Sequence, residues 1–248
     1  LVWVKNELFG LNASGPAPDK LTIEAVKARG FDEIPTYGVT PITVPGVPAA
    51  WAALSKRFGQ LSLLETLQPA IRYAEEGFPL TPILGKYWKI AYEKFKTVGT
   101  SEAFDAWFET FAPEGRAPEI GEVWHSPGHA HTLKEIGKTN AKSFYEGELA
   151  DAIDQCMQQY GGFLSKTDLQ KYHVEWVDPI STNYRGYDVW EIPPNGQGII
   201  TLMGLNILQQ MENTPSDQVT ALHQQIEAMK QAFVDGKAYI TEAANMPI

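Results

Sequence analysis

The loop GLNASGPAP, at residues 10–18, has a composition that suits binding a ligand close to the backbone. Asn12 and Ser14 stand among glycines and small residues, which let the backbone approach a ligand and present its N–H groups as donors. An ordinary surface loop has the same composition and is the safer default. The residue types alone therefore make this loop a possible site and no more.

A second loop of this kind, PPNGQG at residues 193–198, joins a strand-like segment to a strongly apolar one. The double proline holds an extended backbone, while Gly196 and Gly198 permit a ligand to come close. The helix expected to follow would direct its N-terminal dipole at the same place. Such a composition fits a segment that lines a binding site, although an ordinary turn is the commoner explanation.

Three histidines lie close together in HSPGHAH, and imidazoles at this spacing can converge on a zinc ion. Against a zinc site, we expect Pro127 and Gly128 to break any helix that would align His125, His129 and His131. A framing carboxylate or second shell would also be needed. A surface turn before a helix explains the same residues, so we predict no metal and no cofactor.

The sequence lacks the motifs of several large enzyme classes. It contains no GxSxG nucleophile elbow, no Walker loop, no HExxH and no dinucleotide-binding glycine pattern. A net charge of -10, with no cluster of Lys and Arg, argues against a nucleic-acid partner. No run of about 18 uncharged apolar residues is present to span a membrane. We therefore expect a soluble globular protein.

Cys156 is the only cysteine, so no internal disulfide can form. It shares an apolar helical face with Ile153 and Tyr160, which predicts a buried core thiol. The compartment follows weakly from the sequence: without a visible signal peptide, a cytoplasmic location is favoured.

A chain of 248 residues can form one large domain or two small ones. It begins with LVWV, which reads as a strand already under way without an initiator Met, so we expect further sequence to precede it. We predict that residues 1–248 are an incomplete part of a single domain.

Periodicity predicts a helix-rich α+β chain. LVWV and LFGL fit a hairpin, and HVEWV and GYDVWEI suggest two strands of an antiparallel arrangement. A connector at residues 12–48 contains a short helix. The expected helices cover residues 21–29, 49–58, 62–77 with a Ser62–Glu65 capping box, 101–111, 149–160, 199–211 and 219–233.

Three of these helices have distinctive apolar patterns. The helix at 101–111 carries an aromatic stripe, which most often means core, with an acyl-binding pocket as the alternative. The helix at 199–211 is apolar nearly all round, so we expect it to be buried on most sides and to form an exposed patch if the chain is made alone. The helix at 219–233 is amphipathic through Val219, Leu222, Ile226, Met229 and Phe233.

Five segments, in one order along the chain, together resemble the γ-glutamyltransferase (γ-glutamyltranspeptidase) family. They are GLNASGPAP, the segment VPGVPAAW…EGFPLTP at residues 44–82, KSFYEGELADAI, GGFLSKTDLQKYHVEW and PISTNYRGYDVWEIPPNGQG. The resemblance covers nearly the whole chain, on the large-subunit side of the family only. Several matches in order are far more specific than any one of them.

The resemblance implies part of a four-layer αββα sandwich of the N-terminal-nucleophile hydrolase type. In that family a precursor cuts itself into two subunits, and the new N-terminal Thr of the small subunit attacks an amide carbonyl with its own α-amine as base. This implies a small-subunit partner from the same precursor and a small-molecule amide substrate. We place no catalytic residue in these 248 residues.

The resemblance also implies the substrate-binding residues. Family transpeptidases carry an Arg in the first loop that pairs with the substrate α-carboxylate, and this position is Ser14 here. The departure favours hydrolysis of a less glutamate-like acyl group. The second loop follows a strand beside the family's cleft. We therefore expect the substrate-binding residues to be Asn12, Ser14, Asn195, Gly196 and Gln197.

The function implied is that of a γ-glutamyltransferase-like amidohydrolase that works through an acyl-enzyme. The nearest enzyme alternative is a cephalosporin (glutaryl) acylase. An alternative from another class is a non-catalytic helical module for binding or assembly, in which the aromatic helices form an interface.

Overall fold

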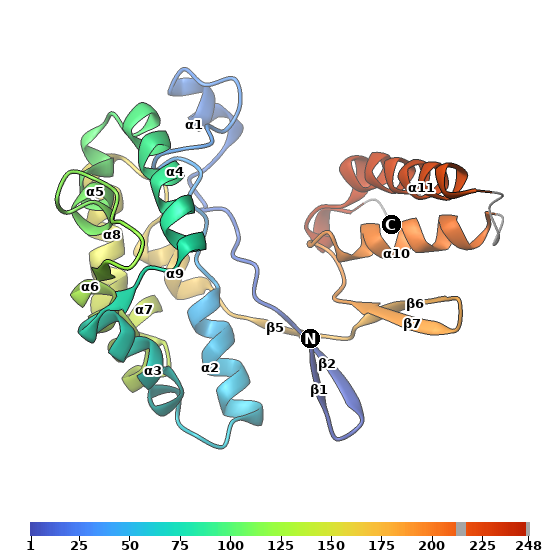
Figure 1. Cartoon of the computed structure of the whole chain (residues 1–248), viewed down its shortest axis with the longest axis horizontal. Coiled ribbons are helices and arrows are strands. Elements are labelled where there is room, and N and C mark those ends of the chain that lie inside the picture. The colour runs from blue at the N-terminus through green and yellow to red at the C-terminus, as the bar shows by residue number, and fades with distance from the viewer. Residues whose placement is uncertain (212–216, 247–248) are drawn as a thin grey trace. The chain divides into compact units, whose positions relative to one another are not determined.

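The structure is a computed structural model that describes residues 1–211 and 217–246 (Figure 1). It is helix-rich and contains short antiparallel strands, which confirms the α+β class. The chain divides into two compact units: Leu1–Ser14 with Val174–Ile248, here called the strand unit, and Gly15–His173, the helical unit. Two such units can belong to one domain, so the single domain stays a prediction.

The helical unit is built around a core that draws on most of its helices. Tyr145 and Leu169 are both buried in it, and α3 packs against α6. Its elements are α1 (Ile23–Ala28), α2 (Val47–Phe58), α3 (Leu63–Glu76), β3 (Phe78–Pro79), α4 (Pro82–Val98), η1 (Glu102–Phe104), α5 (Asp105–Phe111), β4 (Val123–Trp124), α6 (Pro127–Thr139), α7 (Lys142–Tyr145), α8 (Glu148–Tyr160) and α9 (Lys166–Lys171).

Local signals in the sequence set several helix ends of this unit. The predicted capping box at the start of α3 is present: Ser62 Oγ accepts from the Glu65 N–H at 3.2 Å, and Glu65 accepts from the Ser62 N–H at 2.9 Å. Gly77 ends the helix with a φ of 96°, which favours glycine. The α3 helix continues through Pro69.

The predicted aromatic stripe of α5 packs against rings of α4 and β4. Phe95 stacks on Trp107 with ring centroids 4.3 Å apart, and Phe111 stacks on Trp124 at 5.8 Å. These rings are half-buried and cover one another's faces. The packing supports a structural role for the stripe.

The strand unit contains two small antiparallel sheets and two long helices. One sheet has the order β1 (Val2–Val4), β2 (Glu7–Asn12), β5 (Glu175–Val177), and the other pairs β6 (Ile180–Tyr184) with β7 (Tyr187–Glu191). The predicted N-terminal hairpin is thereby confirmed. The helices are α10 (Gly198–Gln209) and α11 (Gln218–Tyr239), followed by η2 (Ala243–Asn245).

HVEWV and GYDVWEI both form antiparallel strands, as predicted, but they do not pair with each other. HVEWV supplies β5, which pairs with β2 through Leu11 and Trp176, whereas GYDVWEI supplies β7, which pairs with β6. The reason is the Arg185-Gly186 turn, where both residues have positive φ and join β6 to β7 directly.

The helices α10 and α11 pack side by side (Figure 1), and of the apolar stripe predicted for α11 only Met229 is seen to take part: a Cβ on Gly204 of α10 would lie 2.9 Å from the Met229 Sδ. The residues of α11 buried against its surroundings are the small ones Ala228, Ala232 and Gly236, and a Cβ on Gly236 would lie 2.4 Å from Ile200 Cδ1 of α10. The side chains of Leu222, Ile226 and Phe233 in the predicted stripe are exposed.

Only Ile200, Leu202 and Gly204 of α10 are fully buried. Its other apolar residues are half-buried, and only Thr201, Asn206 and Gln209 are exposed, so the helix is at least half-buried on most sides, as expected. The prediction of a buried Cys156 is wrong, because its side chain is exposed. The buried face of α8 runs through Leu149 and Met157.

None of the helices in the described part of the chain combines the length and apolar character needed to cross a membrane.

Candidate functional site

The two loops that the sequence marks as candidate binding segments meet in the strand unit. Asn12 ends β2, Asn195 lies between β7 and α10, and the Asn12 Nδ2 donates a hydrogen bond to the Asn195 Oδ1 at 3.1 Å. The two residues are separated by 183 positions in the chain. The fold thus brings together two of the five candidate substrate-binding residues.

The Asn12 side chain also fixes its own loop. Its Oδ1 accepts a hydrogen bond from the Ser14 backbone N–H at 3.0 Å, the geometry of an Asx turn. Because the Asn12 Nδ2 donates to Asn195, both the oxygen and the nitrogen of the Asn12 side-chain amide are hydrogen-bonded. The Ser14 side chain is exposed and makes no hydrogen bond to the described residues, so its hydroxyl is free to meet a ligand.

The rest of the first loop is anchored in the helical unit. A Cβ on Gly15 would lie 1.5 Å from the Val44 carbonyl oxygen, so only glycine fits there, and the Val44 N–H donates to the Pro16 carbonyl at 3.1 Å. The Asp19 N–H donates to the Asp168 Oδ1 at 2.9 Å. The loop therefore has a fixed backbone rather than that of a loose connector.

Asp168 is a buried carboxylate that organises this anchor. Burial opposes its ionised form, but hydrogen bonds from the N–H of Asp19 and from the hydroxyl and N–H of Ser165 outweigh burial and hold the pKa of Asp168 below its usual value. Lys171 nearby donates to the Asp19 carboxylate, and this bond raises the pKa of the Lys171 ammonium.

In the second loop, the other two candidates have different surroundings. A Cβ on Gly196 would meet nothing within 4 Å, so packing gives no reason for a glycine there. Gln197 begins α10 through its backbone carbonyl, which accepts from the Ile200 N–H at 3.0 Å, and its side chain is exposed. Both residues are free to contact a ligand, and their role in binding stays a prediction.

The start of α10 already faces a negative charge from the chain itself. A Cβ on Gly198 would lie 2.5 Å from the Glu191 Oε2, so the Glu191 carboxylate lies at the first turn of the helix. This is where the helix dipole favours an anion. A ligand that approaches the start of α10 would therefore lie near the Glu191 carboxylate.

The three histidines form no shared site. Pro127 begins α6 rather than breaking a helix, so His129 and His131 lie within that helix, against our expectation. Each ring has its own partner: His125 the Glu75 carbonyl at 3.2 Å, His129 the Ser126 hydroxyl at 2.5 Å and His131 the Glu148 carboxylate at 3.2 Å.

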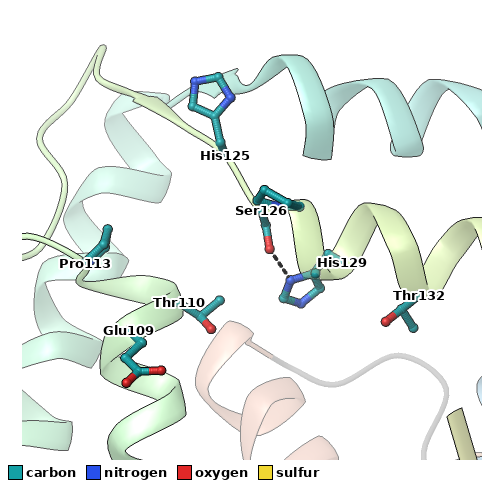
Figure 2. Close-up of a pocket in the computed structure, with 9 residues that line it drawn as sticks. Glu109, Thr110, Pro113, His125, Ser126, His129 and Thr132 are labelled. Carbon is teal, nitrogen blue, oxygen red and sulfur yellow. Dashed lines mark hydrogen bonds between the residues drawn. The ribbon is translucent and has the colours of Figure 1, made fainter.

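Figure 2 shows His125 and His129 on opposite sides of the backbone at Ser126, around a pocket of about 680 Å³. Glu109, Thr110 and Thr132 also line it. Among residues 1–211 and 217–246, no three His, Cys, Asp or Glu side chains come together in a way that could hold a metal ion.

A profile of the Gamma-glutamyltranspeptidase family matches residues 1–248. The chain belongs to this family.

Individual relatives agree with this membership. The chain is 34% identical over 236 residues to the "Glutathione hydrolase-like YwrD proenzyme" of Bacillus subtilis, covering 94% of this chain and 43% of that protein. The crystal structure of a cephalosporin acylase from Bacillus halodurans matches with a TM-score of 0.96 and 57% identity, over 99% of this chain and 46% of that one.

The crystal structure of the Helicobacter pylori gamma-glutamyltranspeptidase matches with a TM-score of 0.88 and 27% identity, over 100% of this chain and 71% of that one. This γ-glutamyltranspeptidase-family chain therefore shares its helix-rich α+β fold with the matching part of that enzyme. It spans less than half of the length of the B. subtilis relative.

Sequence reasoning missed two residues that support the loops of this γ-glutamyltranspeptidase-family chain. Asp168 anchors the first loop, and the SKTD segment held a detectable signal, because Ser165 and Asp168 form a capping box. Glu191 lies beside the second loop, and no local pattern announces its contact with Gly198, which depends on the turn from β7 into α10.

Proposed function

We propose that this chain is the large-subunit portion of an N-terminal-nucleophile amidohydrolase related to γ-glutamyltransferases. The reaction runs through an acyl-enzyme on an N-terminal Thr that lies outside these 248 residues. The observation that carries the proposal is the hydrogen bond between Asn12 and Asn195, which joins the two loops that the family resemblance associates with the substrate.

In this proposal the five loop residues hold the acyl part of the substrate. Asn12 and Asn195 form a rigid amide pair, and Ser14 and Gln197 present free polar side chains beside it. Gly196 leaves room for a ligand atom close to the backbone. Such a site binds an acyl chain with hydrogen-bonding groups, while the chemistry takes place at the Thr.

Ser14 bears on which acyl group is accepted. Loss of a charged, hydrogen-bonded partner typically costs about 2 to 5 kcal/mol when the site is buried, and a hydroxyl cannot replace the two parallel bonds of a guanidinium to a carboxylate. The loop GLNASGPAP contains neither Arg nor Lys. We therefore propose hydrolysis of an amide whose acyl group lacks the α-carboxylate of glutamate.

A glutaryl-type acylase is the second candidate. The observation that favours it is the 57% identity to the B. halodurans cephalosporin acylase, against 34% to the glutathione hydrolase-like protein of B. subtilis. A glutaryl amide keeps the length of a γ-glutamyl amide without its α-amino group. It also keeps the carboxylate that a guanidinium would bind, so this second candidate rests on the sequence identity and not on Ser14.

The proposal includes the architecture of the whole enzyme. The relatives are called proenzymes, and the chain corresponds to 43% of the length of one of them. We propose that the remaining sequence supplies a small subunit with the Thr and further strands, and that both parts complete an αββα sandwich.

The test is a comparison of kcat/KM for matched γ-glutamyl and glutaryl amides with the complete, processed protein. A butyryl amide, which is the glutaryl amide without its terminal carboxylate, is the third substrate. The proposal expects the butyryl amide to be hydrolysed at least about tenfold more efficiently than the γ-glutamyl amide, whereas the glutaryl acylase candidate expects the glutaryl amide to be preferred. Both expect loss of hydrolysis when the small-subunit Thr is replaced by Ala. Efficient preference for the γ-glutamyl amide would defeat the argument from Ser14. If the complete protein hydrolyses none of these amides and its remaining sequence contains no segment that begins with a Thr nucleophile, the non-catalytic binding module is favoured instead.

A further inference from the structure

The second candidate loop, residues 192–197, is closed at its base by a carboxylate. Glu191 is the last residue of β7, and Gly198 is the first residue of α10, which follows it in the chain (Figure 1). A Cβ on Gly198 would lie 2.5 Å from the Glu191 Oε2 and 2.9 Å from the Glu191 Cβ. The two ends of the loop therefore meet at this side chain, and a side chain at position 198 would displace the carboxylate.

The same loop lies against the strand that leads to the first candidate loop. A Cβ on Gly10 of β2 would lie 3.3 Å from the Ile192 Cγ2, and two residues further along β2 the Asn12 side chain bonds to Asn195. The two candidate loops thus leave their strands at neighbouring points. Glu191 directly precedes Ile192, so its carboxylate belongs to the surroundings of both loops.

The Glu191 carboxylate is close enough to act on a ligand that these loops hold. Consecutive Cα atoms are about 3.8 Å apart, so the Glu191 Oε2 lies within about 8 Å of the Gln197 Cα. Solvent-exposed charges act on one another over about 8 Å at physiological salt, and partly buried charges act over more. Glu191 is half-buried, so its charge is felt by a ligand that contacts Gln197.

The charge of Glu191 is not neutralised by the described residues. Within residues 1–211 and 217–246, its side chain forms no hydrogen bond and no ion pair, and the loops GLNASGPAP and PPNGQG contain neither Arg nor Lys. The dipole of α10 is equivalent to about half a positive charge, which offsets only part of a carboxylate. Glu175, exposed and opposite Asn12 in the β2–β5 pairing, adds a second carboxylate. The fixed charge around the two loops is therefore negative.

We propose that Glu191 determines which charge the site accepts at the far end of the acyl group. A half-buried carboxylate attracts an ammonium group and repels another carboxylate. The site then favours amides whose acyl group ends in a cation over neutral ones, and disfavours those that end in a carboxylate. This inference rests on the proposed function and goes beyond the argument from Ser14, because a missing Arg only removes an attraction, whereas Glu191 supplies a repulsion.

A purely structural role of Glu191 would be to stabilise α10. The N-cap residue Gln197 makes no side-chain capping bond, and a carboxylate at the first turn stabilises a helix. Loss of this support would change the hydrolysis of all amides by the same factor, whatever their charge. Discrimination between charged acyl groups therefore separates the two roles.

Three matched amides test the inference on the complete, processed protein. The butyryl amide is neutral, the glutaryl amide carries a carboxylate at the end of the same chain, and the 4-aminobutyryl amide carries an ammonium group there. We expect kcat/KM at low salt to decrease in the order 4-aminobutyryl, butyryl, glutaryl. The ratio of the first to the last should be at least about tenfold.

This ratio of 4-aminobutyryl to glutaryl hydrolysis is the readout for Glu191→Gln, because a general effect of the variant on the fold cancels in it. Glu191→Gln keeps the size of the side chain and removes its charge, and we expect the ratio to fall at least about fivefold. The matched control is Glu7→Gln, which removes an exposed carboxylate at the far end of β2 and should leave the ratio unchanged.

A wild-type preference for the glutaryl amide would overturn the inference and favour the acylase candidate. An unchanged ratio in Glu191→Gln would overturn it as well. If Glu191→Gln does not fold, the wild-type ratio is measured from about 20 mM to about 500 mM salt, where screening should reduce it, and a ratio independent of salt would contradict the inference. Hydrolysis of none of the amides would defeat the proposed function itself, whereas hydrolysis without discrimination by charge would defeat only the role of Glu191.

Discussion

The helical unit and the strand unit differ in how far they complete their own cores. In the helical unit, Leu169 is fully buried, and Arg29 and Asp168 fix distant segments by hydrogen bonds. In the strand unit, the large side chains of α11 and of the β6–β7 hairpin remain exposed. The candidate binding residues nonetheless lie in the strand unit. The less complete region therefore carries the candidate substrate-binding residues, whereas the helical unit has the more complete core.

The largest change in the free energy of unfolding is expected from a substitution in the core of the helical unit. Leu169→Ala removes a fully buried side chain, and we expect a loss of about 2 to 5 kcal/mol in the free energy of unfolding. Denaturant unfolding of the complete protein measures it. The matched control is Ile83→Ala, where the side chain is 70% exposed and we expect a change within about 0.5 kcal/mol. If both variants lose the same free energy of unfolding, Leu169 does not lie in a more tightly packed environment than Ile83.

The two loops offer a matched pair of glycines. Gly15→Ala would place a Cβ 1.5 Å from the Val44 carbonyl oxygen, so the backbone must move, and we expect a loss of about 3 kcal/mol. Gly196→Ala meets open space, and we expect little change in unfolding. The unfolding midpoints of both variants test this contrast. A stable Gly15→Ala protein would mean that the first loop is not held as described.

Asp168 gives a prediction that depends on pH. Its pKa in the folded protein is lowered from 3.8, so its ionised form adds stability above that pH, and this contribution is lost as the pH falls through the lower, folded value. We expect Asp168→Asn to cost about 2 kcal/mol at neutral pH, because charged hydrogen bonds become neutral ones. Unfolding curves at several pH values should show that the difference in free energy of unfolding between Asp168→Asn and wild type becomes smaller below about pH 4. If this difference stays constant down to about pH 2, the charge of Asp168 does not contribute to stability.

Local signals made much of this fold predictable. The Ser62–Glu65 capping box and the N-terminal hairpin depend on residues close in sequence, and both were predictable. The pairing of β6 with β7 escapes prediction because Arg185 takes a positive φ in the turn that its residue type does not announce. The exposure of Leu222, Ile226 and Phe233 on α11 could not be predicted, because periodicity identifies an apolar stripe but not whether another element packs on it.

For the candidate site, the residue types pointed to the two loops, but the contact between them depends on the whole path from β2 through β5, β6 and β7. No spacing in the sequence encodes a hydrogen bond across 183 positions. The contact of Glu191 with Gly198 could not be predicted for the same reason, whereas the Ser165–Asp168 capping box was a local signal for Asp168 and only its bond to Asp19 depends on the fold.

The smallest effect concerns this contact between Asn12 and Asn195, and it decides whether the two loops act as one site. A neutral hydrogen bond contributes about 1 kcal/mol, so we expect Asn12→Ala and Asn195→Ala each to lower kcat/KM for the preferred amide by about fivefold. Because both variants break the same bond at 3.1 Å, the double variant should lose little more than either single one. Ser14→Ala is the control for stability, since the Ser14 side chain bonds to none of the described residues, and its unfolding should match wild type. If the losses in the double variant multiply, Asn12 and Asn195 act independently, and the pair is a packing contact rather than one binding element.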